Sequence, residues 1–217
     1  MNIIKEVFRR ITPYMRANGF VPTGKSFCRL ANDIAYCISF DAPGGLLYVT
    51  AHLMPLYVPC ESKYYTYGNR LNAIQKISLP LLNKNDAEAI INTWCLTLCE
   101  QIDRHILPFF EDVGSPQKLL AYVDSHSCAW NEYIACHEVY IWMLKLYTYI
   151  YTGNYDKASF VISSYRKVLR NITFLSDLVI QKYSAEIDEI ELIMQKERAI
   201  AEKYCIDIIC NTKKVLN

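Results

Sequence analysis

The sequence predicts an α+β protein in which a helix and a small antiparallel sheet precede a mostly helical remainder. Apolar residues recur at helical spacing over residues 2–18, alternate with a period of two over residues 26–53, and return to helical spacing after residue 85. The chain has 217 residues, of which 52% are hydrophobic, and this is enough for a packed core. We expect residues 1–84 and residues 85–217 to form two parts that pack together as one globular unit.

The first helix should cover one face of a three-stranded meander. Its apolar residues share one face, Pro13 is expected to kink it or split off its last turn, and Asn18 with Gly19 should end it. The strands are predicted at residues 26–30, 34–40 and 46–53, joined by tight turns. Residues 54–84 are less regular, and the tyrosine-rich stretch within them is consistent with a fourth strand or with an ordered loop.

The remainder of the chain is predicted to be helical. Helices are expected from residue 85 towards Pro108 and again from Ser115. A helix hairpin is predicted within residues 130–170, with Trp142 among the apolar residues that fill its first arm and with Gly153 in its turn. The turn resembles that of a tetratricopeptide-type repeat, but one such unit predicts a single hairpin and not an array. Residues 173–214 are predicted to form one long amphipathic helix.

Charge and composition favour a cytoplasmic protein with no nucleic-acid partner and no membrane partner. The 23 basic and 22 acidic residues give a net charge of +1, so the basic excess that phosphate binding requires is missing. No apolar run approaches the roughly 18 residues of a transmembrane helix, and the N-terminal segment lacks the features of a signal peptide. We therefore expect the nine cysteines to stay reduced and to act mainly as small hydrophobic residues.

The best-spaced candidates for chemistry are Cys95 and Cys99, which lie one helical turn apart, with His105 further along the chain. Structural zinc sites usually show closer ligand pairs such as Cys-x-x-Cys, and no local signature of a cysteine nucleophile surrounds these thiols. His52 falls on the third predicted strand, where a half-buried surface histidine is the simpler interpretation. We expect no metal, no cofactor and no catalytic residue, and a metal- or thiol-dependent enzyme is the alternative.

A tyrosine-rich cluster is the candidate binding surface. Tyrosine and arginine are enriched at interface hot spots, because they bury a large area at low entropic cost and keep a polar group. Most of the cluster falls in the irregular segment, where recognition surfaces often lie, and the other interpretation is the edge of an amphipathic core. The predicted partner-binding residues are Tyr48, Tyr57, Tyr64, Tyr65, Tyr67 and Arg70.

Residues 13–53 resemble a family of bacterial proteins that carry a domain of unknown function. The family pattern is a short helix, a Gly-Phe pair, a basic or glycine turn, and a strand that begins with an aromatic residue followed by x-Arg. The matching positions are Gly19-Phe20, Gly24-Lys25 and Phe27-Cys28-Arg29, and the similarity extends towards Trp94, Leu107-Pro108 and residues 153–158. The resemblance implies no enzymatic activity, and by analogy it implies an immunity protein that neutralises a bacterial toxin.

Together these features predict a non-enzymatic protein-binding module, with a cognate toxin as the partner that the resemblance implies. Two alternatives stay open. One is the metal- or thiol-dependent enzyme that uses helix cysteines and a histidine. The other is a structural oligomer that assembles through the helix expected over residues 173–214.

Overall fold

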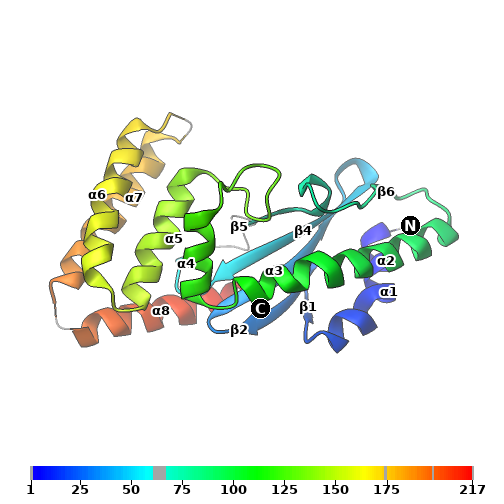
Figure 1. Cartoon of the computed structure of the whole chain (residues 1–217), viewed down its shortest axis with the longest axis horizontal. Coiled ribbons are helices and arrows are strands. Elements are labelled where there is room, and N and C mark those ends of the chain that lie inside the picture. Colours follow the sequence, from blue (N-terminus) through cyan, green and yellow to red (C-terminus); the bar gives the residue numbers. More distant parts are fainter. Residues whose placement is uncertain (1, 61–66, 174, 197, 217) are drawn as a thin grey trace. The chain divides into compact units, whose positions relative to one another are not determined.

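The computed structural model describes residues 2–60, 67–173, 175–196 and 198–216. It confirms the α+β class: an N-terminal helix, an antiparallel sheet, and helices throughout the C-terminal half (Figure 1). The chain forms two compact units, the first comprising Met1–Pro55 and Lys63–Cys136 and the second Leu56–Ser62 and His137–Leu216. The first unit extends to residue 136, because the helices that directly follow residue 85 pack on the N-terminal helix and on the sheet.

In the first unit, α1 (Ile3–Ala17) begins at Asn2, whose side chain caps the first turn. The residues that repeat every four positions along one face are all buried: Ile3, Val7, Ile11 and Met15. The helix continues through the exposed Pro13, so this residue does not split off the last turn. It ends as predicted, with Gly19 at a φ of 79°, a conformation that glycine adopts without strain.

The sheet has more strands than the three or four expected. Its main path follows chain order, with every neighbour antiparallel: β1 (Val21–Thr23), β2 (Ser26–Ala31), β3 (Ile34–Asp41), β4 (Leu46–Pro55) and β5 (Tyr67–Arg70). A sixth strand, β6 (Leu82–Asn83), pairs with the start of β4. The strands that the sequence does not reveal, β1 and β6, have three and two residues, too few for alternation to be recognised.

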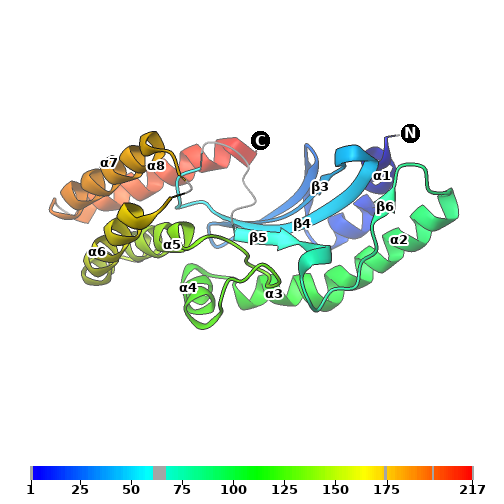
Figure 2. The same ribbon diagram turned by 90° about the horizontal axis from the view of Figure 1, so that it is seen from above.

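Helices cover one face of this sheet (Figure 2). The elements that follow β6 in the first unit are α2 (Glu88–Gln101), a π-helical segment (Ile102–Ile106), α3 (Leu107–Asp112) and α4 (Pro116–Ser125). The ring of Phe8 in α1 stacks on Phe27 in β2, with 4.4 Å between centroids, and Phe110 in α3 lies 5.0 Å from Tyr36 in β3. Phe27 and Tyr36 point to the same face of the sheet, so aromatic contacts fix α1 and α3 against it.

The second unit contains α5 (Glu138–Tyr151), α6 (Tyr155–Asn171), α7 (Asp177–Met194) and α8 (Arg198–Leu216). Helices α5 and α6 form the predicted hairpin, with Gly153 at a φ of 71° in its turn. In place of the one long helix expected over residues 173–214, the structure has α7 and α8. Helix α7 ends at Met194 and α8 begins at Arg198, so the expected helix is divided in two. The buried stripe of α7 ends at Ile193, and the first buried residue of α8 is Ala201.

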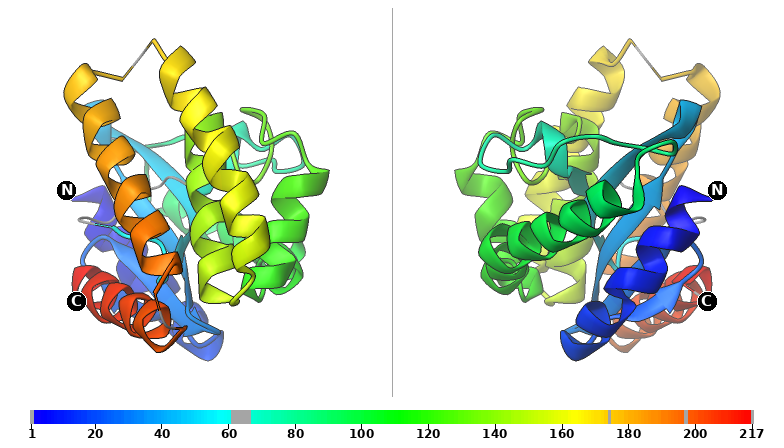
Figure 3. Two further views of the ribbon diagram at one scale, coloured as in Figure 1. Left: turned by 90° about the vertical axis from the view of Figure 1, so that its left-hand side faces the viewer. Right: turned by 90° about the vertical axis from the view of Figure 1, so that its right-hand side faces the viewer.

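Polar contacts join the helices of this unit. Tyr147 of α5 is only 1% exposed, and its hydroxyl donates to the Glu186 carboxylate of α7 and is hydrogen-bonded to Tyr204 of α8. Helices α6 and α7 lie side by side (Figure 3, left), and Arg166 of α6 places a guanidinium nitrogen 2.7 Å from Glu191 Oε2 of α7. Among the described residues, no helix combines the length and the apolar character that crossing a membrane requires.

Candidate functional site

Two of the six predicted partner-binding residues meet at the surface of the first unit. Tyr48 in β4 and Arg70 in β5 lie on the sheet face opposite α1, and the Arg70 guanidinium carbon is 4.2 Å from the centroid of the Tyr48 ring. Arg70 is exposed and Tyr48 is half-buried. This cation–π contact favours one orientation of the charged guanidinium over the tyrosine ring.

The other four predicted residues do not extend this patch. Tyr57 is 0% exposed, belongs to the second unit and stacks on Tyr151 with 4.7 Å between ring centroids. Tyr67 is 4% exposed, because alternation in β5 turns it to the covered face of the sheet. Tyr64 and Tyr65 lie outside the described residues. For Tyr57 and Tyr67 the core interpretation of the aromatic cluster therefore replaces the surface interpretation.

The helix cysteines have the properties of core thiols. Cys95 is 5% exposed and Cys99 is half-buried. Burial, followed by the nearby Cys95 and Asp103, raises the pKa of the Cys99 thiol to about 12, so almost none of it is thiolate near neutral pH. Within the described part of the chain, no cluster of three histidine, cysteine or acidic side chains could hold a metal ion.

His52 is not the half-buried surface residue that the sequence favours, since only 1% of it is exposed. Its Nε2 atom is 2.8 Å from Ser39 Oγ, and Ser39 Oγ is 2.6 Å from Ser26 Oγ. The three side chains form a buried polar chain across β4, β3 and β2. Because buried polar groups are costly unless they are hydrogen-bonded, this chain ties the register of the three strands together.

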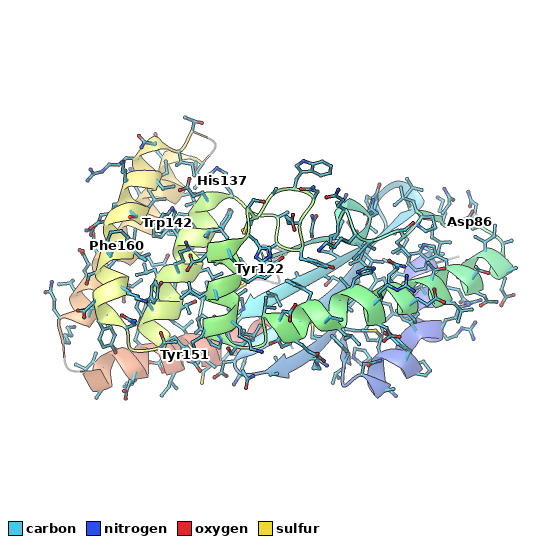
Figure 4. All side chains as sticks on the ribbon, in the orientation of Figure 1. Asp86, Tyr122, His137, Trp142, Tyr151 and Phe160 are labelled. Atoms are coloured by element: carbon cyan, nitrogen blue, oxygen red, sulfur yellow. The ribbon has the colours of Figure 1, made fainter. Side chains whose placement is uncertain are left out.

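A groove that sequence reasoning missed lies on the α5–α6 hairpin, within the second unit. It encloses about 540 Å³. Figure 4 labels His137 and Trp142, which lie on the α5 side, and the last turns of α6 form the opposite wall. The lining residues are His137, Glu138, Trp142, Ser164, Lys167, Val168, Asn171, Ile172 and Thr173.

Trp142 is held at the wall of this groove by charged neighbours on its own helix. Its indole Nε1–H donates to Glu138 Oε1 at 2.9 Å, and the Lys145 ammonium lies 5.1 Å from its ring centroid. Val168 and Ile172 add apolar surface, and the exposed Lys167 contributes a positive charge. The groove thus combines an apolar wall with a polar, partly cationic rim.

The volume of the groove is within the range of about 300–1,000 Å³ that is usual for ligand sites. The sequence pattern placed Trp142 in the filling of the first hairpin arm, whereas the structure leaves it half-buried. The signal that could have revealed it is the pair of charged residues one turn to either side, Glu138 and Lys145.

Comparisons with protein-family models, with curated proteins and with solved structures find no significant match to the chain.

Proposed function

We propose that this protein is a protein-binding module that accepts an extended segment of a partner in the groove between α5 and α6. The observation that carries the proposal is the position of Trp142, a large side chain kept half-buried in a concave site of about 540 Å³. Tryptophan is the residue most enriched among interface hot spots, and such residues act from pockets that exclude water. Apolar and aromatic-lined grooves are among the recurring sites of peptide recognition.

The lining of the groove defines the chemistry of the segment. Val168 and the Trp142 ring offer contact to one large apolar or aromatic side chain. Lys167 is exposed at the rim, and the Lys145 ammonium lies against the Trp142 ring, while Glu138 is engaged by the indole N–H. Lys167 is therefore the cation of the lining that a ligand meets at the rim, while the Glu138 carboxylate is already directed towards the indole. We expect a segment that carries an aromatic or large aliphatic residue close to aspartate or glutamate.

A random-peptide display library selected against the purified full chain tests this proposal. Enriched peptides should share an apolar residue next to an acidic one. Their affinity should fall about tenfold or more with Trp142→Ala or with Lys167→Glu, because the first removes the anchor and the second reverses the complementary charge. Lys203→Glu is the matched control, since Lys203 is an exposed lysine on α8 outside the groove.

Selection without enrichment would overturn the proposal, and so would peptides that bind the Trp142, Lys167 and Lys203 variants equally. Peptides that lose affinity with Arg70→Glu and keep it with Lys167→Glu would transfer the binding site to the Tyr48–Arg70 pair. That result would reject the groove and support the surface predicted from the sequence.

A cognate bacterial toxin is the specific partner that the family resemblance implies, and it belongs to the proposal as the first full-length partner to test. Co-expression with the product of an adjacent toxin gene should give a complex that Lys167→Glu weakens. A toxin whose activity is unchanged by the wild-type chain would remove the immunity role and leave the peptide-binding proposal intact.

The oligomer alternative has one observation in its favour. Exposed apolar side chains lie on the last two helices: Leu178 and Leu192 on α7 are 76% and 60% exposed, and Ile206 on α8 is 58% exposed. Light scattering at increasing protein concentration should show a dimer that Leu192→Glu dissociates. A monomer at all concentrations excludes assembly through these helices.

A further inference from the structure

The face of the α5–α6 hairpin that holds the groove continues towards the hairpin turn. On α5, Lys145 and Tyr149 follow Trp142 at three and seven positions, so the three side chains lie on one side of the helix. On α6, Phe160 and Lys167 are seven positions apart and likewise share a side. Trp142 and Lys167 both line the groove. Tyr149 and Phe160 therefore lie two helical turns further along the same face.

A second cation–π contact shows that the two helices also face each other at this end of the hairpin. The Lys157 ammonium of α6 lies 5.7 Å from the centroid of the Tyr149 ring of α5. At the groove, the Lys145 ammonium lies 5.1 Å from the centroid of the Trp142 ring. The hairpin face thus presents an aromatic ring of α5 with a lysine against it at two places. These places are about 10 Å apart, because each residue of a helix advances the chain by about 1.5 Å.

Phe160 adds a large apolar surface to the second of these places. Its side chain is 72% exposed, and Figure 4 labels it on α6. Its neighbours on the helix surface include Lys157, one turn before it, and Ser164, one turn after it, which lines the groove. The fold gains little from this ring, because most of the ring stays in water. A partner that covers Phe160 gains the burial that the folded chain leaves unused.

We propose that the hairpin face is a docking surface with two anchor positions, one at Trp142 and one at Tyr149 and Phe160. The segment bound in the groove continues along the hairpin and places a second large apolar side chain against Phe160. This inference rests on the proposed peptide-binding function and specifies its ligand. An extended segment advances about 3.3 Å per residue, so its two anchor residues should be about three positions apart.

The charges along the hairpin face complement an acidic segment. Lys145 lies between the two rings of α5, Lys157 lies at the second anchor position, and Lys167 lies at the rim of the groove. Of the acidic side chains close to them, Glu138 already accepts an indole N–H, and Asp156 lies in the first turn of α6, where the helix dipole favours a negative charge. We therefore expect the ligand to carry aspartate or glutamate next to both of its anchor residues.

Fluorescence anisotropy with synthetic peptides and the full chain tests this proposal. Each peptide carries two phenylalanines, each next to an aspartate, in a glycine-serine background, and the phenylalanines are from one to about eight positions apart. Affinity should be highest near a spacing of three, and about tenfold above that of a peptide with only one phenylalanine. Phe160→Ala should remove this advantage and leave the affinity of the one-anchor peptide unchanged. Trp130→Ala is the matched control, because Trp130 is 77% exposed and belongs to the first unit.

Reversal of a charge tests the same anchor position without removing a ring. Lys157→Glu should weaken the binding of the two-anchor peptide, and a peptide with lysine in place of the second aspartate should recover the lost affinity. A second phenylalanine that adds no affinity would overturn the proposal, and so would equal affinities for the Phe160→Ala and Trp130→Ala variants. An optimum near seven positions would also overturn it, because a helical ligand spans the same distance with about seven residues.

The variant Trp142→Ala separates a failure of this inference from a failure of the proposed function. If the second anchor fails and the one-anchor peptide still loses affinity with Trp142→Ala, the groove binds peptides and only the extended docking surface is rejected. If the peptides bind the wild-type chain and the Trp142→Ala variant equally, or bind neither, the groove itself is rejected together with the second anchor position.

Discussion

Replacing Gly68 with alanine probes how closely β5 approaches β4. A Cβ atom at this position would lie 2.3 Å from the Ala51 carbonyl oxygen and 2.4 Å from the His52 Cβ. The first is a backbone atom, and the second belongs to a side chain that is 1% exposed and hydrogen-bonded to Ser39. Neither can move away cheaply, so β5 itself must shift from β4. This shift weakens the strand that carries Arg70.

Overpacking typically costs about 1–3 kcal/mol, and two contacts well below van der Waals distance place Gly68→Ala at about 3 kcal/mol or more. Urea titration of the purified variant measures the loss in the free energy of unfolding. Gly24→Ala is the matched control, because Gly24 has a φ of 62° and its Cβ would meet nothing within 4 Å. In the control, the free energy of unfolding should fall only by the cost of placing alanine in the left-handed conformation, about 1–2 kcal/mol. If Gly68→Ala loses no more than Gly24→Ala, the steric argument for the β4–β5 contact is refuted.

Tyr147→Phe should lower the free energy of unfolding by about 2 kcal/mol, because the Glu186 carboxylate loses the hydrogen bond that the Tyr147 hydroxyl donates. Tyr48→Phe is the control, since the ring of Tyr48 is half-buried at the surface, and it should cost less than about 0.5 kcal/mol. Equal losses in the two variants would contradict a stabilising role of the Tyr147 hydroxyl. Stability should also fall as the pH rises from about 8 to about 10. Burial raises the pKa of Cys205 to about 11 and that of Cys99 to about 12 in the folded chain. The unfolded chain therefore releases these thiol protons at a lower pH than the folded chain does, and rising pH favours unfolding. Equal urea midpoints at the two pH values would contradict this expected loss of stability. Alkylation of Cys205 at about pH 8 should be roughly 100-fold slower than in urea, as peptide mapping can measure, and similar rates would show that the thiol is accessible.

The parts of the fold that could be predicted are those with long, regular patterns. Four buried residues repeat along α1, and the alternation in β3 runs through eight residues, so both elements lie where the sequence places them. Strand β1 has three residues and includes Pro22, so neither its length nor its composition indicates a strand. Its pairing is decided by the neighbouring β2, a contact that no local pattern contains.

The candidate site was harder to predict, because the same residue types serve the core and the surface. Tyr57 and Tyr67 satisfy the compositional rule for interface hot spots, yet both are buried. The break between α7 and α8 has no local signal in the sequence, since Gln195, Lys196 and Arg198 all belong to residue types that favour helix. The groove has no local signal either, because it depends on how the end of α6 faces the start of α5, and that depends on the packing of the whole hairpin.

Trp142 shows what can separate a surface aromatic residue from a core one on a helix. Residues three and four positions away are neighbours on the helix surface, and those of Trp142 include the charged Glu138 and Lys145. Charged side chains are rarely fully buried, so the ring between them must stay near water. Tyr147 is the contrasting case that the same rule explains: its neighbours at these spacings are all apolar or aromatic, and it is 1% exposed. Phe160 follows the same rule as Trp142, since its neighbours at these spacings are aspartate, lysine and two serines, and it is 72% exposed. The identity of the neighbours, more than the aromatic residue itself, therefore determines which rings a partner can reach.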